Sequence, residues 1–306
     1  MTAITVKPKR KAKRRDIVFP VVNTVILCLL MFITVYPVIN TLAVSFNDGT
    51  DAVRGGIGLW PRKWSLEAYK TIFTGNEIID AFKISVAKTI ITTVLNLFFT
   101  SMLAFALSRK EYIFRRFITV VLVLTMYINA GLIPNFLLVS KVLGLSKSFL
   151  AYIIPSMFSC FNMIVIRTYI CGLPEALVES ARIDGASDVV AFFKIILPLC
   201  LPVLATVALF VAVGSWNSWF DTYLYNGSKP KLYTLQYVLK IKLNSLTNQM
   251  NQANSTADAN AQIQKQASTV TVRAAISVVS AVPILIIYPF LQRYFVTGMA
   301  LGSVKG

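Results

Sequence analysis

The chain has 306 residues, of which 56% are hydrophobic and only 14% are charged, and its mean hydropathy is +0.67. Soluble globular domains carry roughly 25% charged residues, so this composition excludes an ordinary soluble domain. Several apolar runs reach the roughly 20 residues that cross a bilayer as a helix. The net charge is +17 and there is no histidine, which excludes His-ligated metal sites and His-based catalytic triads. We therefore expect a polytopic membrane protein.

The first element is a basic tail over residues 1–16, in which seven basic residues lie between Lys7 and Arg15. Such a run can bind nucleic acid or serve as a nuclear signal. Directly before an apolar segment, however, it is typical of a determinant that keeps the N-terminus in the cytoplasm. The segment 17–46 is too long for the apolar region of a signal peptide and lacks a clear cleavage pattern. We expect it to hold an uncleaved first span.

Six apolar segments are expected to cross the membrane as α-helices, because a lipid-facing segment must satisfy its backbone hydrogen bonds internally. Their approximate limits are residues 17–40, 84–107, 117–140, 149–171, 197–219 and 272–292. Prolines inside them predict kinks that neighbouring helices tolerate. We expect free thiols, acting as small buried apolar side chains, at the four cysteines in or beside these segments, which are Cys28, Cys160, Cys171 and Cys200.

Charge sets the expected orientation of the spans. The two sides differ little in their number of basic residues, but the positive-inside rule weighs short loops and span ends. There the tail and SRKEYIFRR, residues 108–116, dominate. We therefore expect both termini in the cytoplasm, a transmembrane domain over 17–296 and a cytoplasmic C-tail over 297–306. Long outside loops are expected at 47–81 and 221–270, the first with a Gly-rich turn and the second with partial helix over its Asn-, Gln- and Ala-rich part.

Between two of the spans lies PEALVESARIDGASDVVAFFKIILPL, residues 174–199, which is polar and punctuated. Pro174 suits the first position of a helix, where its missing N–H costs nothing. Glu175 and Glu179 place negative charge in the first turns, which favours the helix dipole. This first helix is too short to span a membrane.

A second helix is expected after a glycine hinge. Gly185 tolerates the left-handed conformation that ends a helix, and Ser187 or Asp188 can cap the next helix over 189–196. The charge pattern places this segment in the cytoplasm. From these residues alone, a surface linker and a helix pair that docks into a partner's groove are equally supported.

The same segment resembles the EAA loop of ABC importer permeases, E-A-A-x3-G-x9-I-x-L-P. Ser180 stands where the family usually has Ala, and the intervals from Glu179 to Pro198 are intact. Further segments resemble the carbohydrate-importing, maltose-type branch of the binding-protein-dependent inner-membrane components. They are WSLEAYKTIF (64–73), LAFALSRKEY (103–112), GLIPNFLLVSKVLGL (131–145), WNSWFD (216–221) and YPFLQRYFVTGMALGSVKG (288–306). The last three are similar to permeases for lipo-oligosaccharides or complex polysaccharides.

The resemblance implies a type I importer permease fold and a set of partners. Such a permease pairs with a second, homologous permease, with two cytoplasmic ATPase subunits and with an extracellular solute-binding (lipo)protein that delivers a carbohydrate. It is not itself an enzyme and holds no cofactor or metal, because ATP and Mg²⁺ bind to the ATPase subunits. The sequence agrees, since it contains no G-x-x-x-x-G-K-[ST] phosphate-binding loop.

The resemblance also implies two sets of contacts with the ATPase. The docking set comprises Glu175, Glu179, Ser180, Ala181, Asp184, Gly185, Ile195, Leu197 and Pro198. The tail set comprises Gly302, Ser303, Val304, Lys305 and Gly306. Within the docking loop we expect a charge-assisted contact at Glu179 and apolar packing at Ala181, Val189 and Ile195.

A sugar path needs amides for hydrogen bonds and aromatic faces for stacking. The candidates in the expected spans are Asn96, Asn129, Asn135, Asn162, Trp216, Asn217 and Trp219. The same residue types also join membrane helices and form aromatic belts at the interfaces, so both roles stay open.

Other classes of function are less well supported by the sequence. An ion-coupled transporter typically carries intramembrane carboxylates, and no Asp or Glu lies in the middle of an expected span. A membrane enzyme would need paired acids or a nucleophile motif, and neither occurs. A permease for a solute other than sugar and a passive scaffold remain alternatives.

Overall fold

The computed structural model describes residues 14–74, 76–128, 130–253 and 269–289. Over these ranges the chain is helical, as expected, and its only bridge between extended residues joins Asn47 to Trp64. It divides into two compact units. The first comprises Met1–Thr71 and Met250–Val278, and the second comprises Ile72–Gln249 and Val279–Gly306.

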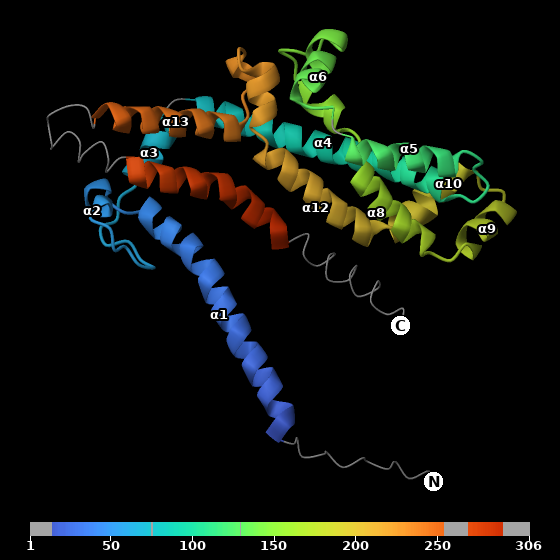
Figure 1. The fold of residues 1–306 in the computed structure, drawn as a ribbon, viewed down its shortest axis with the longest axis horizontal. Helices are drawn as coiled ribbons and strands as arrows, with labels where there is room; N and C mark the ends of the chain where they lie inside the picture. Colours follow the sequence, from blue (N-terminus) through green and yellow to red (C-terminus); the bar gives the residue numbers. More distant parts are fainter. Residues whose placement is uncertain (1–13, 75, 129, 254–268, 290–306) are drawn as a thin grey trace. The chain divides into compact units, whose positions relative to one another are not determined.

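The first unit begins with the long helix α1, Arg14–Ser45 (Figure 1). Its segment Val18–Ser45 contains an 18-residue window with a mean hydropathy of 2.5 in which no residue is buried. An exposed surface this apolar belongs in lipid or against a partner rather than in water. The short helix α2, Gly49–Val53, follows and is capped by the Asp48 carboxylate, which accepts from two backbone N–H groups.

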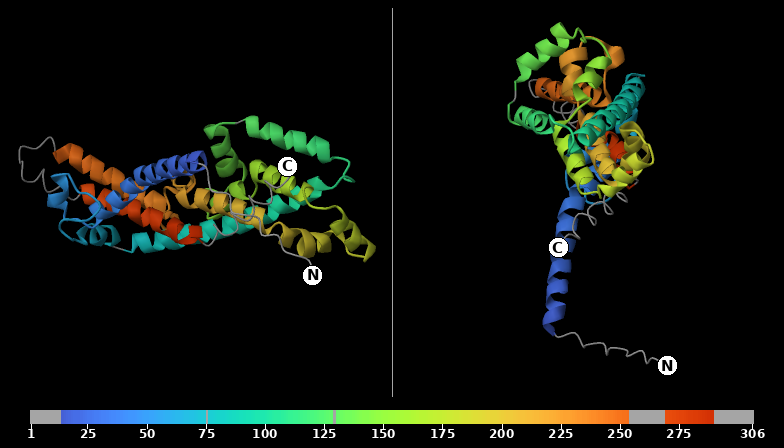
Figure 2. Two further views of the ribbon diagram at one scale, coloured as in Figure 1. Left: turned by 90° about the horizontal axis from the view of Figure 1, so that it is seen from below. Right: turned by 90° about the vertical axis from the view of Figure 1, so that its right-hand side faces the viewer.

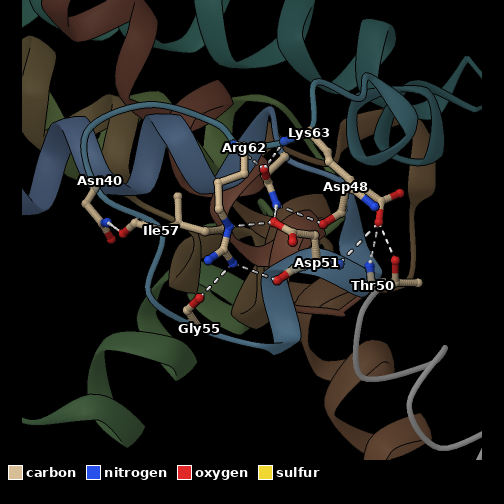
Figure 3. A network of polar contacts seen from close by, with 9 residues as sticks. Asn40, Asp48, Thr50, Asp51, Gly55, Ile57, Arg62 and Lys63 are labelled. Atoms are coloured by element: carbon tan, nitrogen blue, oxygen red, sulfur yellow. Dashed lines mark hydrogen bonds and ion pairs between the residues drawn. The ribbon is translucent and has the colours of Figure 1, made fainter.

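A network centred on Asp51 orders the loop after α1 (Figure 3). Arg62 Nε and Asn47 Nδ2 each donate to Asp51 Oδ2 at 2.9 Å. The hydrogen bond from Asn47, followed by that from Arg62, holds the pKa of the Asp51 carboxyl below its usual range. The backbone of Arg62 in turn donates to the Asn47 amide oxygen at 2.8 Å. These bonds close residues 47–62 on themselves, so the expected Gly-rich turn is part of an ordered structure.

The second unit is built around α4, Glu77–Ser108. Helices α8, Cys160–Cys171, and α12, Leu201–Asn217, pack along it (Figures 1 and 2). The apolar core lies where these helices meet and includes the fully buried side chains of Leu107, Met163, Ile166 and Val207.

Shorter elements connect and cover these helices. They are α3 (Glu67–Phe73), α5 (Arg115–Tyr127), α6 (Leu132–Leu137), the π-helical turn Leu138–Val142, α7 (Leu150–Ile153), the 3₁₀ turns Ile154–Ser156 and Pro230–Leu232, the π-helical turn Thr222–Asn226, and α13 (Leu235–Ala253). The last described helix is Thr269–Pro289. Helix α13 confirms the expected partial helix in the second long loop, and residues 254–268 lie outside the described part of the chain.

Three described helices are long and apolar enough to cross a membrane, namely Val18–Ser45, Glu77–Ser108 and Thr269–Pro289. Three bent pairs of shorter helices add up to three more spans, if each pair counts as one. These bent pairs overlap the expected spans 117–140, 149–171 and 197–219, and they confirm the expectation that the helices there are kinked.

The bends have local causes. The chain breaks between α5 and α6, where Gly131 has a φ of +88°. The second pair bends by 47° just before α8, where Ser159 is extended and its hydroxyl accepts from Asn162 N. The third pair bends by 79° at Cys200, after which Pro202 stands in the first turn of α12. Proline lacks the N–H that a continuous helix needs there, so α12 starts anew.

The four cysteines are free thiols, as expected. Their expected burial is correct for Cys200 and wrong for Cys28 and Cys171, whose side chains are exposed on helix surfaces. In a chain of this composition such surfaces face lipid or a partner, where a small apolar thiol costs little.

A buried ion pair joins α4 to the segment after α12. Lys88 Nζ lies 2.5 Å from Asp221 Oδ2, and the lysine side chain is only 3% exposed. The ammonium also lies 4.9 Å from the centre of the Tyr152 ring, whose hydroxyl donates to Thr222 Oγ1 at 3.1 Å. Lys88 lies near the start of the expected span 84–107 and Asp221 just beyond the end of the expected span 197–219, but the sequence did not show that the two charges meet.

We expect Lys88→Met to destabilise the protein strongly, because it leaves the Asp221 carboxylate without its partner. Breaking a buried pair in this way costs about 3–5 kcal/mol. The matched control is Lys83→Met on the same helix, whose pair with Asp80 has side chains 70% and 65% exposed. Exposed pairs contribute about 0–1 kcal/mol. Thermal unfolding of the purified protein in detergent measures both, and equal shifts of the midpoint would contradict a structural role for the buried pair.

Candidate functional site

Residues 174–198 form two short helical pieces at the C-terminal end of α4 (Figure 1). Helix α9, Ala176–Ile183, ends at Gly185, which has a φ of +79°. Gly185 N donates to Arg182 O at 3.0 Å and Ala186 N donates to Ala181 O at 2.9 Å. These two bonds are the Schellman arrangement that satisfies the last carbonyls of a helix. The hinge expected at Gly185 is confirmed.

The second piece starts at Ser187, whose hydroxyl accepts from Val190 N at 3.4 Å. Of the two expected caps, Ser187 takes the role. Helix α10, Asp188–Ala191, continues into a π-helical turn at Phe192–Ile196 and into α11, Leu197–Leu199. At the other end, α9 begins two residues after Pro174. Pro174 was expected at the first helical position, but it lies before the helix and its carbonyl accepts a hydrogen bond in the first turn.

Helix α9 has an inner and an outer face. Val178 and Ala181, three residues apart, are 3% and 7% exposed and face the core. Glu179 and Ile183, four residues apart, lie on the outer face, and Ile183 is 86% exposed. Residues three or four apart lie on the same face of a helix, so this spacing accounts for the buried inner face and the exposed outer face of α9. Within the described residues the Glu179 side chain makes no hydrogen bond or ion pair, so its carboxylate is available to a partner.

The remaining members of the docking set divide in the same way. Ala181 is buried, while Ile195 and Leu197 are half-buried. Of the three side chains expected to pack on the ATPase, only Val189 is largely exposed, and Ile183 was not singled out from the sequence. The exposed members are Glu175, Glu179, Ser180, Asp184, Gly185 and Pro198.

Two groups of ion pairs tie this loop to the segment between α4 and α5. Lys110 Nζ lies 2.7 Å from Glu175 Oε2. Arg182 pairs with Glu111 and, through Nη2, with Asp188 Oδ1 at 3.0 Å. The hydrogen bond from Arg182 holds the pKa of the Glu111 carboxyl below its usual range. Glu175, placed in the docking set from the sequence, is thus occupied within the chain, and the segment SRKEYIFRR has a structural role beyond setting orientation.

Among the candidate path residues, the buried ones join helices. Asn96 on α4 donates to Ser156 O at 2.8 Å, and Asn162 on α8 donates to Asn96 Oδ1 at 3.4 Å. Trp216 is buried and its indole N–H donates to Ser280 O at 3.0 Å. These contacts favour the helix-joining alternative for the three side chains.

Asn217 and Trp219 are exposed instead. Trp219 belongs to an exposed aromatic trio with Phe220 and Tyr223, in which the ring centres lie 5.6 to 6.4 Å apart. The two additional rings were not singled out from the sequence, although Phe220 follows WNSW directly and Tyr223 lies three residues further on. Asn129 and the tail residues Gly302–Gly306 lie outside the described part of the chain.

The family model of the binding-protein-dependent transport system inner membrane component matches residues 97–301. The chain belongs to this family. The match covers both α9 and the aromatic trio, and it makes the protein the membrane component of a transport system. The resemblance inferred from the EAA loop is thereby confirmed, as is a location in the membrane.

The permease is similar over nearly its whole length to two proteins of Bacillus subtilis strain 168. It is 38% identical over 283 residues to the polygalacturonan/rhamnogalacturonan transport system permease protein YtcP, covering 91% of this chain and 96% of that protein. It is 35% identical over 289 residues to protein LplC, covering 94% and 95%. A solved bacterial ABC transporter involved in the import of the acidic polysaccharide alginate matches with a TM-score of 0.80 and 29% identity, over 94% of this chain and 100% of that chain.

Gly185→Val is expected to impair transport, because a β-branched side chain resists the positive φ that the Schellman turn needs. The conformational cost is about 1–2 kcal/mol, since no atom lies within 4 Å of the added Cβ to contribute a clash. Gly185→Asn is the matched control, because Asn tolerates the left-handed region. Uptake and ATPase activity of the reconstituted importer measure the effect, and equal activity of the two variants would refute the hinge.

Glu111→Arg and Arg182→Glu are each expected to weaken coupling between ATP hydrolysis and uptake, because each leaves like charges opposed. The double variant restores the Glu111–Arg182 pair with its charges exchanged and is expected to recover part of the coupling. In the native protein the depressed pKa of Glu111 means that the pair contributes its full stabilisation above the usual pKa of a glutamate and is lost only as pH falls through the lower value of the folded state. Coupling in each variant is measured in proteoliposomes as the number of sugars imported per ATP hydrolysed. Double-variant coupling no better than that of the worse single variant would contradict the pairing.

Proposed function

We propose that the permease is one half of the transmembrane pathway of an ATP-driven carbohydrate importer, and that α9 is its handle for an ATPase subunit. The observation that carries the proposal is the outer face of α9, which presents the unpaired Glu179 carboxylate beside the exposed Ile183. A short helix with an apolar anchor and a free charge is suited to a groove on a partner protein. The absence of a G-x-x-x-x-G-K-[ST] motif from the sequence supports the proposal that ATP and Mg²⁺ bind to that partner.

The proposed assembly has two ATPase subunits, a second homologous permease and an extracellular binding protein that delivers the solute. Six spans and an arrangement with both termini in the cytoplasm put α9 on the ATPase side. The density of basic residues in the tail and in SRKEYIFRR supports this orientation. The tail residues Gly302, Ser303, Val304, Lys305 and Gly306 are proposed as a second contact with the ATPase dimer.

The proposed substrate is an oligosaccharide. Similar permeases are named for polygalacturonan and rhamnogalacturonan and for arabinooligosaccharides, and the similar solved transporter imports alginate. The exposed trio Trp219, Phe220 and Tyr223, with the Asn217 amide nearby, supplies the stacking faces and the hydrogen-bonding group that a sugar requires. Asn129 completes the proposed path set, and Asn162 and Trp216, whose contacts join helices, support the pathway wall.

In the proposed mechanism, ATP binding closes the ATPase dimer and carries the docking loop with it. Val178 couples this movement to the core, because it packs α9 onto the apolar cluster of α4, α8 and α12. The paired permeases then change from inward-open to outward-open and accept the sugar from the binding protein. Closure can shift the equilibrium only through contacts that differ between the two states, and α9 is where those contacts are made.

The test is Glu179→Ala in the reconstituted complex. We expect hydrolysis stimulated by the binding protein to fall about tenfold or more, because a charge-assisted contact contributes about 1.5–3 kcal/mol. The control is Glu77→Ala, which removes an exposed carboxylate from the first turn of α4. Complex assembly is followed by size-exclusion chromatography. Normal stimulation and uptake in Glu179→Ala would remove the assignment of α9 as the handle, whereas loss of uptake without loss of assembly separates a permease from a passive scaffold.

A further inference from the structure

A cavity of about 370 Å³ lies beside the start of the docking loop, and four cationic side chains line it. The cations are Arg109, Lys110, Arg115 and Arg167, and among the described residues that line the cavity only Glu175 carries a carboxylate. Cavities of about 300–1,000 Å³ are typical of small-ligand sites. The rest of the wall is mainly apolar and comes from the ends of α8 and α9 and from Ile196.

Two of the four cations are satisfied within the chain. Lys110 pairs with Glu175 at 2.7 Å, and Arg167 Nε donates to Leu107 O at 3.0 Å. With Glu175 engaged, the cavity has no free carboxylate for the other two.

Arg109 and Arg115 are both half-buried, and neither forms an ion pair with a residue that the structure describes, although the charge of Arg109 acts on the nearby Glu111 carboxyl. The Nε of Arg109 is buried without a hydrogen-bond acceptor, and its guanidinium group lies 4.7 Å from the centre of the Phe105 ring. The side chain of Arg115 makes no hydrogen bond or ion pair to any residue that the structure describes. A buried donor without an acceptor costs free energy, and a half-buried charge without a partner costs more.

We propose that this cavity binds a phosphate group, presented by the headgroup of an anionic phospholipid or by a soluble phosphate. Arginine recognises phosphate because its planar fork of N–H donors matches two phosphate oxygens at once. Arg109 and Arg115 supply that recognition, and Lys110 and Arg167 add positive charge to the wall. The proposal rests on the proposed function only in placing the cavity at the cytoplasmic surface of the membrane.

The lipid source fits the position of the cavity. Its walls belong to the ends of α4 and α8 and to the first residue of α5, which is where apolar helices leave the hydrocarbon region. Basic pockets between membrane helices on the cytoplasmic side bind anionic headgroups. The apolar part of the wall, with Ile170 and Leu173, can accept the glycerol and the first carbons of an acyl chain.

The experiment uses the full importer complex in nanodiscs made of phosphatidylcholine. Phosphatidylglycerol is added in defined amounts and the bound lipid is counted by native mass spectrometry, and in a second arm inorganic phosphate is titrated by calorimetry. We expect the double variant Arg109→Gln/Arg115→Gln to bind phosphatidylglycerol at least about tenfold more weakly, because charge-assisted hydrogen bonds contribute about 1.5–3 kcal/mol each. Arg116→Gln is the matched control, because Arg116 is an exposed neighbour that does not line the cavity.

The outcomes of the experiment distinguish a lipid headgroup from a soluble phosphate as the ligand. Saturable binding of phosphatidylglycerol that inorganic phosphate does not displace assigns the site to lipid, and saturable binding of inorganic phosphate in the phosphatidylcholine discs assigns it to a soluble phosphate. The single variant Arg115→Lys keeps the charge but loses the fork, and an intermediate affinity supports recognition by arginine even if the double variant fails to fold.

Three results would overturn the proposal. One is no saturable binding of either probe, and another is an equal loss of binding in Arg116→Gln. The third is release of the ATPase subunits from the double variant without any change in phosphate binding, which would assign the cavity to a carboxylate of that partner. Glu179→Ala is expected to retain phosphate binding, so the two proposals fail independently.

Discussion

The Schellman turn at Gly185 fixes which side chains the docking loop presents. By ending α9 at Ile183, the turn leaves that side chain on the outer face beside Glu179 and turns the chain back so that Ser187 can start α10. If residues 184–187 had continued α9 as a regular helix, the apolar residues of α10 would instead lie on other faces of that longer helix. The positive φ that the turn needs is therefore a constraint on partner recognition as well as on local structure.

Polar contacts determine which helices of the second unit pack against each other, because apolar contacts alone would not distinguish one partner helix from another. Lipid tails are as apolar as leucine, so burial of an aliphatic side chain between membrane helices gains little over exposure to lipid. The pairs Lys88–Asp221 and Asn96–Asn162 specify instead which helix meets which, because an unpaired amide or charge at these positions would be costly. The three residues of the aromatic trio at Trp219 flank Asp221 in the chain. The buried pair, by fixing Asp221, therefore also positions the exposed rings.

Much of the fold could be predicted from the sequence because its determinants are local. Apolar length gave the helical membrane class, and the order Glu179, Gly185, Ser187 gave the two helical pieces of the docking loop through capping chemistry. What escaped prediction depends on contacts between distant residues: Lys88 and Asp221 are separated by 133 positions, and Arg182 and Glu111 by 71. Sequence spacing carries no information about such pairs. The bends at Ser159 and Cys200 escaped for a related reason, since prolines near them indicate kinks but not the residue at which a helix restarts.

Helix α4 contacts both the docking loop and the segment that carries the aromatic trio. At about 1.5 Å per residue, the 32 residues of α4 extend about 48 Å, which is longer than the hydrocarbon core of a bilayer. Lys88 ties its first half to Asp221 beside the aromatic trio, and Leu107 at its other end accepts from Arg167 and packs in the core beneath α9. Directly beyond its last residue, Lys110 and Glu111 hold the docking loop by ion pairs. A hydrogen-bonded helix resists compression along its axis, so in the proposed mechanism a displacement of the docking loop would reach the aromatic end as a rigid-body movement of α4. We therefore expect the side chains that fasten α4 at its two ends to be as important for coupling as the proposed contacts with the ATPase and the sugar.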